Sequence, residues 1–278
     1  MTRTAGLIGH PVAHSLSPVF QNAAFQHCGL DVVYTAWDTP AARLRTRMQR
    51  LRSAEMLGAN VTIPHKQAVM PHIDELGDFS RRVGAVNTIV NREGRLFGFN
   101  TDGPGFVQSL KDERNFDPRG ANVLVFGAGG AARGIVLALV DAGAAVSIAN
   151  RTPSRAEDLA HTAGAGARAV RQPGDLAAYD VLVNTTSIGM EGTGTEDQSP
   201  SDFLGARPGA FAVDIVYAPE RTTFLRDAEA AGLRTLGGLA MLVYQGALAF
   251  THWTGIHAPV EVMFDAARNE LARRGPAR

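Results

Sequence analysis

A stretch near the middle of the chain limits it to few folds. Residues 123–126 form a short apolar run that predicts a buried parallel strand, and residues 135–140 predict the apolar body of a helix. Between them, Gly127 permits a tight turn, Gly129 lets the backbone approach a pyrophosphate, and Ala132 is small where the helix packs on the strand. We therefore predict a dinucleotide site, with a purely structural glycine turn as the alternative.

The composition narrows the class of protein and its partners. Hydrophobic residues make up 45% of the 278 residues and charged residues 19%, which predicts a well-packed globular protein with room for two modest domains. The 27 Lys and Arg residues balance the 27 Asp and Glu residues, so no charge excess favours nucleic acid or an anionic membrane. Cys28 is the single cysteine, which suits a reducing compartment. Because no apolar run approaches the roughly 20 residues of a membrane helix and no apolar leader is apparent, we expect a cytoplasmic protein.

The first hundred residues alternate between predicted strands and helices. Strands are expected at 5–9, 32–37 and 57–61, with helices at 19–28 and 41–51 between them. This alternation predicts a mostly parallel sheet with crossover helices. A hairpin of two further strands is expected at 83–90 and 96–99.

A polar, glycine-rich break at 100–105 predicts a domain boundary. We expect an α/β protein of two α/β domains: residues 1–103 with 239–278, and a Rossmann-type domain over residues 104–238. The last two helices have no strand between them, so they are expected to pack back on the first domain. Surface loops are expected at 162–169 and 192–200, strands at 145–149, 181–184 and 212–215, and helices at 106–113, 155–162, 241–253 and 259–272.

Ser15 and Ser17 follow the first predicted strand. Small ligands bind at the carboxyl ends of strands in open α/β sheets, and two hydroxyls spaced by one residue can clamp a carboxylate. The structural alternative is that Ser17 only caps the next helix, with Pro18 at its first position.

Lys66 and Asp102 form a chemically meaningful pair. A lysine can exchange a proton with a hydroxyl or ketone, and a nearby carboxylate can orient both groups. Each also has a structural interpretation, since most lysines are solvated and Asp102 could cap the helix at 106–113. Asn87 could hydrogen-bond substrate hydroxyls, whereas Tyr217 and Gln245 by themselves are typical of buried polar residues with satisfied partners. The histidines lack metal-ligand spacing, so no metal is predicted.

The end of the second strand of the dinucleotide unit favours NADP over NAD. Enzymes that read a free ribose 2′-hydroxyl place an Asp or Glu there, whereas this chain has Asn150, Arg151, Thr152 and Arg155. The two arginines would attract a 2′-phosphate through bidentate hydrogen bonds. Solvated arginines at a helix start are the structural alternative.

Nine motifs in order resemble the shikimate dehydrogenase family over residues 6–254. They are GHPVAHSLSP (9–18), NVTIPHK (60–66), GAVNT (84–88), GFNTDGPG (98–105), GAGGA (127–131), NRT (150–152), NTTSIGM (184–190), DIVYAP (214–219) and GLAMLVYQ (238–245). Gln21, Thr185 and Thr223 depart from the family pattern, where histidine, alanine and proline are common.

The resemblance implies an oxidoreductase of aromatic amino acid and chorismate biosynthesis that reduces 3-dehydroshikimate to shikimate with NADPH, reversibly. It implies Lys66 and Asp102 as the catalytic pair. The implied substrate site consists of Ser15, Ser17, Thr62, Lys66, Asn87, Asp102, Tyr217 and Gln245. The implied cofactor site consists of Gly127, Ala128, Gly129, Gly130, Ala131, Asn150, Arg151, Thr152, Arg155, Ile215, Gly238 and Asp78, with Ile215 and Gly238 near the nicotinamide.

Two alternatives remain open at this point. The nearest is a quinate/shikimate dehydrogenase with a broader range of substrate and cofactor, against which the paired serines and paired arginines argue. The other is a non-catalytic NADP-binding regulator, against which the intact Lys66 and Asp102 argue. The resemblance leaves open whether the chain is a monomer or a homodimer.

Overall fold

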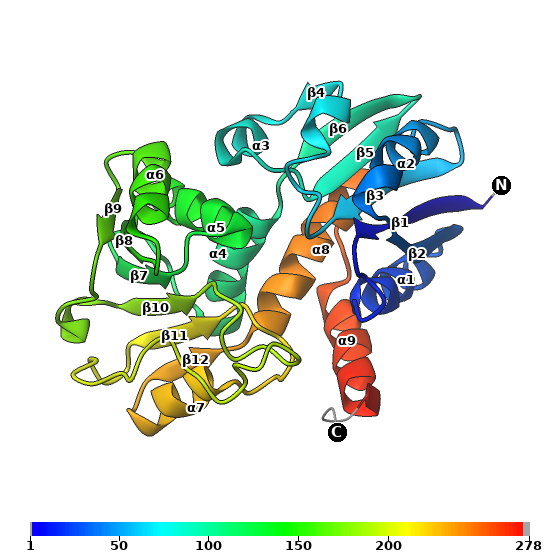
Figure 1. The fold of residues 1–278 in the computed structure, drawn as a ribbon. Helices are drawn as coiled ribbons and strands as arrows, with labels where there is room; N and C mark the ends of the chain where they lie inside the picture. Colours follow the sequence, from blue (N-terminus) through cyan, green and yellow to red (C-terminus); the bar gives the residue numbers. More distant parts are fainter. Residues whose placement is uncertain (1, 275–278) are drawn as a thin grey trace. The chain divides into compact units, whose positions relative to one another are not determined.

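The computed structural model describes residues 2–274 and divides into two compact units (Figure 1). The first unit contains residues 2–101 and 243–274, and the second contains residues 102–242. A long helix, α8 (Gly238–Thr254), begins in the second unit and ends in the first.

The first unit is built on a mixed six-stranded sheet with the order β2-β1-β3-β5-β6-β4. The pairs β1–β2 and β1–β3 are parallel, whereas β5 is antiparallel to both β3 and β6. The strands are β1 (Arg3–Gly9), β2 (Val32–Asp38), β3 (Met56–Val61), β4 (Glu75–Leu76), β5 (Thr88–Arg92) and β6 (Arg95–Phe99). The helices are α1 (Ser17–His27), η1 (Ala41–Arg43), α2 (Leu44–Arg50), η2 (Met70–His72), α3 (Asp78–Val83) and α9 (Val260–Arg274).

Helices cover both faces of this sheet. On one face, Leu44 and Met48 of α2 pack with Ile8 and Ile89 of the strands. On the other face, Phe25 of α1 stacks on Trp253 of α8, and the Trp253 indole N–H donates to the carbonyl of Ile89 at 2.9 Å. Helices α1 and α9 lie side by side (Figure 1), so the expectation that the C-terminal helices return to the first domain is confirmed.

The second unit is a fully parallel sheet with the order β12-β11-β10-β7-β8-β9. Read from β9, its strands follow the chain order 3-2-1-4-5-6 of a dinucleotide-binding doubly wound sheet. The strands are β7 (Asn122–Phe126), β8 (Ala145–Ala149), β9 (Ala167–Val170), β10 (Val181–Asn184), β11 (Phe211–Asp214) and β12 (Arg234–Leu236). The helices are α4 (Asp102–Arg114), α5 (Gly130–Asp141), α6 (Pro153–Ala163), η3 (Leu176–Ala178) and α7 (Thr223–Ala230). The predicted Rossmann-type fold is therefore confirmed.

Strand β7 is buried on both faces. Leu124 packs in a cluster with Phe224 of α7, and its two neighbours along the strand, Val123 and Val125, are also fully buried. Helices α4 and α5 pack closely enough to require Gly103, since a Cβ there would lie 2.2 Å from the carbonyl oxygen of Gly134. The continuous apolar run that predicted a parallel strand reflects this two-sided burial.

Two helix starts differ from the predictions. Ser17 is the first residue of α1 rather than its cap, because Leu16 already has helical dihedral angles and takes the cap position. Helix α4 starts at Asp102 rather than near residue 106, so Asp102 lies within its first turn instead of preceding it.

Several short elements escaped the sequence analysis. The strand predicted over 83–90 is wrong in its first half: α3 ends at Gly84, whose φ of +69° terminates the helix, and β5 starts only at Thr88. The supposed loop at 162–169 contains the start of β9, and the strand β12 and the helix α7 were not predicted. The short edge strands β9 and β12 are defined by their pairing with β8 and β11, and no pattern in the local sequence predicts such pairing.

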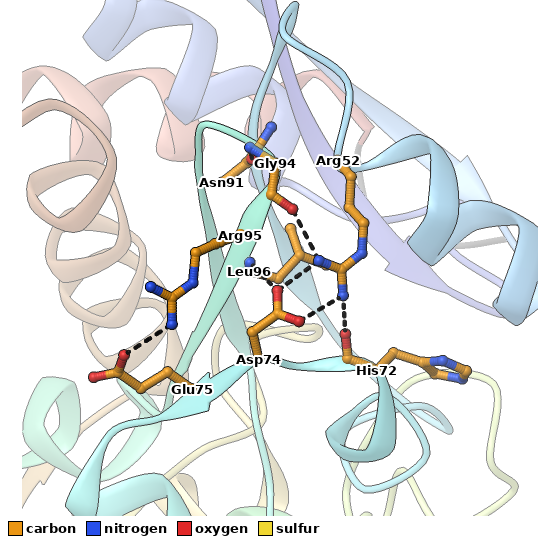
Figure 2. A network of polar contacts seen from close by, with 8 residues as sticks. All are labelled: Arg52, His72, Asp74, Glu75, Asn91, Gly94, Arg95 and Leu96. Atoms are coloured by element: carbon orange, nitrogen blue, oxygen red, sulfur yellow. Dashed lines mark hydrogen bonds and ion pairs between the residues drawn. The ribbon is translucent and has the colours of Figure 1, made fainter.

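A polar network closes one edge of the first sheet (Figure 2). Arg52 donates from its two terminal nitrogens to the Asp74 carboxylate at 2.5 and 3.1 Å, and also to the carbonyls of Gly94 at 2.8 Å and His72 at 3.0 Å. Asp74 accepts the N–H of Leu96 at 2.7 Å, and these bonds hold the pKa of its carboxyl below the usual range. The network joins the segment before β3, the β5–β6 turn and the segment before β4.

We predict that R52A destabilises the protein. The arginine satisfies two backbone carbonyls and one carboxylate from a partly exposed position, so its loss should lower the free energy of unfolding by about 1–2 kcal/mol. Urea unfolding near neutral pH measures this change. The control is R45A, which removes an exposed arginine of the same helix region; equal stability of the two variants would contradict the prediction.

Candidate active site

Four chain segments meet at the opposite edge of the first sheet. Strand pairing aligns Ile8 with Val61, Asn60 with Thr88, and Thr88 with Phe99. The ends of β1, β3 and β6 and the start of β5 therefore share one edge. The segments that follow or precede them carry the sequence-predicted residues Ser15, Ser17, Thr62, Lys66 and Asn87.

Ser15 and Ser17 lie in the turn between β1 and α1. The Ser15 hydroxyl accepts the backbone N–H of Ser17 at 3.1 Å, which fixes both residues relative to the helix start. Ser17 is buried and Ser15 is half-buried. Ser17 occupies the first position of α1, and Leu16 occupies the cap position.

The loop after β3 holds Lys66 between two fixed neighbours. The Lys66 carbonyl accepts the N–H of Val86 at 2.8 Å. The imidazole of His65 is buried, and its Nε2 lies 2.5 Å from the Thr39 carbonyl, which ties the loop to the end of β2. Lys66 itself is half-buried, and Thr62 precedes it in the same turn. The loop thus presents the lysine from a rigid backbone rather than from a mobile surface segment.

Asn87 is oriented by its own hydrogen bonds. Its Oδ1 accepts the backbone N–H of Thr101 at 2.7 Å, and because a backbone N–H can only donate, this contact assigns the amide orientation. Its Nδ2 donates to the Thr101 hydroxyl at 2.9 Å and to Oε1 of Gln245 at 3.3 Å. Both the amide NH₂ group and Oδ1 of Asn87 therefore have partners within the first unit, and these partners fix the side chain at this edge of the sheet.

A second layer of polar residues supports Asn87 from below. Nδ2 of Asn60 donates to the Asn87 carbonyl and to the Thr88 hydroxyl, both at 3.2 Å, and the Tyr34 hydroxyl donates to Oδ1 of Asn60 at 2.9 Å. Burial raises the pKa of Tyr34 well above its usual value, so its phenol stays protonated as a donor. Sequence reasoning missed Asn60, although it stands in one of the motifs.

The two predicted acidic residues each begin a helix. Asp102 follows Thr101 directly, is buried, and begins α4 in the second unit. Asp78, predicted for the cofactor side, begins α3 in the first unit and is paired with Arg81 at 2.8 Å while remaining exposed.

In the second unit the strand order reverses between β7 and β10, and ligands bind at such a switch point. Gly127 follows β7 with a φ of +111°, and a Cβ there would lie 2.5 Å from Oγ1 of Thr185 after β10. Gly127 is therefore required by the protein's own packing. Ala128 and Ala131 share this turn and are half-buried.

Gly129 and Gly130 have a different explanation. Gly129 has φ −83° and ψ −170°, which any residue adopts, and a Cβ on either glycine would meet no protein atom within 4 Å. Neither packing nor backbone strain explains the missing side chains. They lie at the N-terminus of α5, where unpaired N–H groups attract a phosphate, so the arrangement fits a pyrophosphate.

The end of β8 carries the residues that were predicted to read the ribose. Nδ2 of Asn150 donates to the Thr152 carbonyl at 2.8 Å, which bends the chain into α6. Arg151 and Arg155 are exposed, and among residues 2–274 neither guanidinium has an ion pair or hydrogen bond. Both are therefore available to an anionic group.

Ile215, Tyr217 and Gly238 lie at or after the end of β11. Gly238 is required by packing, since a Cβ would lie 2.3 Å from the Ile215 carbonyl oxygen. Its N–H donates to the Val216 carbonyl at 3.2 Å. Ile215 and Tyr217 are half-buried.

Sequence reasoning missed the most buried charge of the second unit. Asp214 ends β11 without exposed surface, and burial raises the pKa of its carboxyl to about 6 against the opposing effect of hydrogen bonds from Thr222, Val216 and Asn184. Asp214 begins the motif at 214–219, but nothing in the local sequence indicates that an Asp at the end of a strand is buried.

None of the described helices is long and apolar enough to cross a membrane. Within residues 2–274, no group of three or more His, Cys, Asp or Glu side chains is placed to hold a metal ion.

Three family models match successive parts of the chain. Residues 7–89 match the shikimate dehydrogenase substrate binding domain, residues 110–215 match shikimate / quinate 5-dehydrogenase, and residues 238–268 match the shikimate 5'-dehydrogenase C-terminal domain.

Individual relatives match over nearly the whole length. The shikimate dehydrogenase (NADP(+)) of Moorella thermoacetica is 46% identical over 99% of this chain and 97% of its own. The shikimate 5-dehydrogenase of Thermus thermophilus, solved with NADP(H) and shikimate, is 44% identical with a TM-score of 0.89, covering 96% of this chain and 99% of its own. A quinate dehydrogenase from Corynebacterium glutamicum, solved with NAD, is 30% identical with a TM-score of 0.88, covering 96% and 99%.

We predict that Asp214 makes stability fall as the pH rises from about 4 to 6. Since the carboxyl of an unfolded chain has a pKa near 4, the folded protein binds more protons at Asp214 within this interval. The favourable contribution is therefore present at low pH and is lost as the pH passes the folded pKa, by roughly 2–3 kcal/mol.

The D214N variant isolates this contribution because its amide does not titrate. Urea unfolding near pH 4.5 and near pH 7.5 should show that the wild type loses about 2 kcal/mol more than D214N between the two conditions. An equal loss in both proteins would contradict the assignment.

Proposed function

The chain belongs to the shikimate dehydrogenase family, and from that premise we propose that it catalyses the reversible NADP(H)-dependent reduction of 3-dehydroshikimate to shikimate. One observation carries the proposal. Gly129 and Gly130, where a side chain would meet no protein atom, lie in the turn at the switch point of a doubly wound sheet. A dinucleotide fits such a turn. The convergence of polar loops at one edge of the first sheet supports the substrate side.

We assign substrate binding and catalysis to residues 1–103 with 239–278, and cofactor binding to residues 104–238. In the first, the hydroxyls of Ser15 and Ser17 bind the substrate carboxylate. The amide of Asn87 is assigned to hydrogen-bond a substrate hydroxyl. The proposed substrate site is completed by Thr62, Lys66, Asp102 and Gln245 from the same residue ranges and by Tyr217 from residues 104–238.

Lys66 is the proposed proton donor and acceptor. Reduction of a ketone places a hydride on carbon and a proton on oxygen, and NADPH supplies the hydride when it is bound. The ammonium of Lys66 delivers the proton to the oxygen, and in the reverse direction the amine removes it from the hydroxyl. Asp102 is assigned the role of orienting this exchange. Lys66 and Lys111 are the only lysines among the 27 Lys and Arg residues. Almost all other basic positions are arginine, which stays protonated, whereas position 66 has a lysine, whose side chain can exchange a proton.

The cofactor assignments follow the second sheet. Residues 127–131 hold the pyrophosphate, and Asn150, Arg151, Thr152 and Arg155 surround the 2′-phosphate. Ile215 and Gly238 are assigned to the nicotinamide side. Asp78, which the resemblance implies for the cofactor side, is exposed and forms an ion pair with Arg81.

The proposed partners are small molecules, with no nucleic acid or membrane. We propose the cytoplasm as the compartment because the single cysteine, Cys28, suits a reducing environment. The proposal is neutral between a monomer and a homodimer.

Broad specificity for quinate and NAD is the second candidate, which the likeness to the NAD-bound quinate dehydrogenase favours. The available arginines after β8 favour NADP. The deciding experiment measures reduction of NADP⁺ with shikimate and repeats it with quinate and with NAD⁺. Turnover confined to shikimate and NADP⁺ supports the proposal, and comparable turnover with the substitutes supports the broader enzyme. Cofactor binding by folded protein without turnover in any combination would support a regulator instead.

We predict that K66A lowers kcat by about 10²–10⁴-fold, the usual contribution of general acid–base catalysis, while the KM for shikimate changes much less. Steady-state kinetics with saturating NADP⁺ measures both constants. The matched control is K111A, which removes the chain's other lysine, an exposed residue of α4. Near-normal kcat in K66A would exclude the proton-transfer role.

We predict that R151A weakens NADP⁺ binding by about tenfold or more and leaves NAD⁺ binding nearly unchanged, because the arginine pairs only with the 2′-phosphate. Titration calorimetry with both cofactors measures the difference. R119A removes an exposed arginine before β7, at the other edge of the same sheet, and should change neither. Equal losses for both cofactors would contradict the assignment.

We predict that G129A folds with wild-type stability but binds NADP⁺ at least about tenfold more weakly, since a methyl group there meets only the ligand. G127A should instead lose stability, because it combines a positive φ with contact to Thr185. Thermal unfolding with and without NADP⁺ separates the two effects. Unchanged affinity in G129A would count against a pyrophosphate at this turn.

A further inference from the structure

A buried carboxylate in the second unit has no role in the function proposed above. Asp214 ends β11, has no exposed surface, and all its hydrogen-bond partners in the described structure are neutral donors. Its Oδ1 accepts Nδ2 of Asn184 at 3.1 Å and the N–H of Val216 at 3.0 Å. Its Oδ2 accepts the hydroxyl of Thr222 at 2.6 Å.

These three bonds join three separate segments. Asn184 ends β10, Val216 belongs to the loop after β11, and Thr222 caps α7, where its hydroxyl also accepts the N–H of Leu225. A buried charge is costly, and a carboxylate is retained in such a place only when donors satisfy it. Two of the three partners, an amide NH₂ and a backbone N–H, can only donate, so the arrangement suits the ionised carboxylate.

The network continues into the loop after β10. Oδ1 of Asn184 accepts both the N–H and the hydroxyl of Thr186, at 3.0 and 2.7 Å. The neighbouring Thr185 donates from its hydroxyl to the Phe126 carbonyl at 2.7 Å, at the end of β7. The carboxyl ends of β7, β10 and β11 are thereby tied into one rigid edge.

That edge is the part of the proposed cofactor site opposite β8. A dinucleotide with its pyrophosphate at α5 and its 2′-phosphate after β8 must extend its other half over β10 and β11. The loop of Ile215 and Val216 follows β11 there, and the Val216 N–H is held directly by Asp214.

We propose that Asp214 is a positioning residue that fixes the loop carrying Ile215, and with it the placement of the nicotinamide half of the bound cofactor for hydride transfer. This inference rests on the proposed function. Asp214 touches neither substrate nor the reacting atoms; it acts by holding the backbone of the 215–217 loop against the loop after β10.

The test compares D214N with the pair T222V and T222S. D214N keeps the shape of the side chain but replaces one acceptor oxygen with a donor. T222V removes the hydroxyl while the carboxylate stays in place, so it carries the test if D214N fails to fold. T222S restores the hydroxyl and should rescue the function. The matched control is D180N, because Asp180 accepts the N–H of Asn122 at 2.8 Å at the other edge of the same sheet.

The readouts are kcat, the KM for shikimate and the kinetic isotope effect with shikimate deuterated at the carbon that is oxidised. D214N and T222V should lower kcat by about tenfold or more, leave KM within about twofold and raise the isotope effect, because a misplaced nicotinamide slows hydride transfer itself. T222S and D180N should resemble the wild type. Wild-type kcat and isotope effect in folded D214N and T222V, or equal losses in D180N, would overturn the inference.

The failure of the proposed function is distinguishable from this outcome. An inactive wild-type protein contradicts the proposed reaction, whereas an active wild type with unaffected variants contradicts only the role of Asp214. Amide hydrogen exchange provides a readout independent of activity: residues 185–188 and 215–217 should exchange faster in D214N and T222V than in the wild type. Unchanged exchange in both variants would contradict the positioning network.

Discussion

Hydrogen bonding between neighbouring strands is the constraint on which both candidate sites depend. In the first sheet it aligns Ile8 with Val61 and Thr88 with Phe99, so loops far apart in the sequence start from one edge. In the second sheet it places the ends of β7 and β10 side by side at the point where the strand order reverses. The chemistry lies in the loops, but the sheets decide which loops meet.

Buried polar networks then give each edge a defined geometry. In the first unit, Tyr34 donates to Asn60 and Asn60 donates to the backbone carbonyl of Asn87, while Oδ1 of Asn87 accepts the N–H of Thr101. In the second unit, Asp214 and Asn184 tie the loops after β10 and β11 together. Each network buries polar groups and satisfies them with hydrogen bonds inside the protein. Burial costs desolvation free energy, and the hydrogen bonds in return fix the orientation of the side chains. In both units these supporting side chains are buried.

Much of the fold was predictable because its signals are local. The strand–glycine–helix unit at 123–140, the hairpin at β5 and β6 and the long C-terminal helices have strong periodicity or turn chemistry. Short elements such as α3, β9 and β12 were missed or misplaced because pairing and packing, rather than their own residues, stabilise them. The Ser-Pro signal left open whether Ser17 caps the helix, and the structure places Ser17 at the first position of α1 because the helix begins one residue earlier than that signal suggests.

The sequence alone determined the fold class and the residues proposed to carry chemistry, since Ser15, Lys66 and the residues after β8 lie in motifs that are recognisable from the local sequence. Only the tertiary structure decided which of their atoms are available. It showed that Gly127 is required by packing whereas Gly129 is not, and that Oδ1 of Asn87 accepts the N–H of Thr101. It also showed that Asp214 is buried among donors. Burial and hydrogen-bond partnership arise from residues distant in the chain, so no local pattern encodes them.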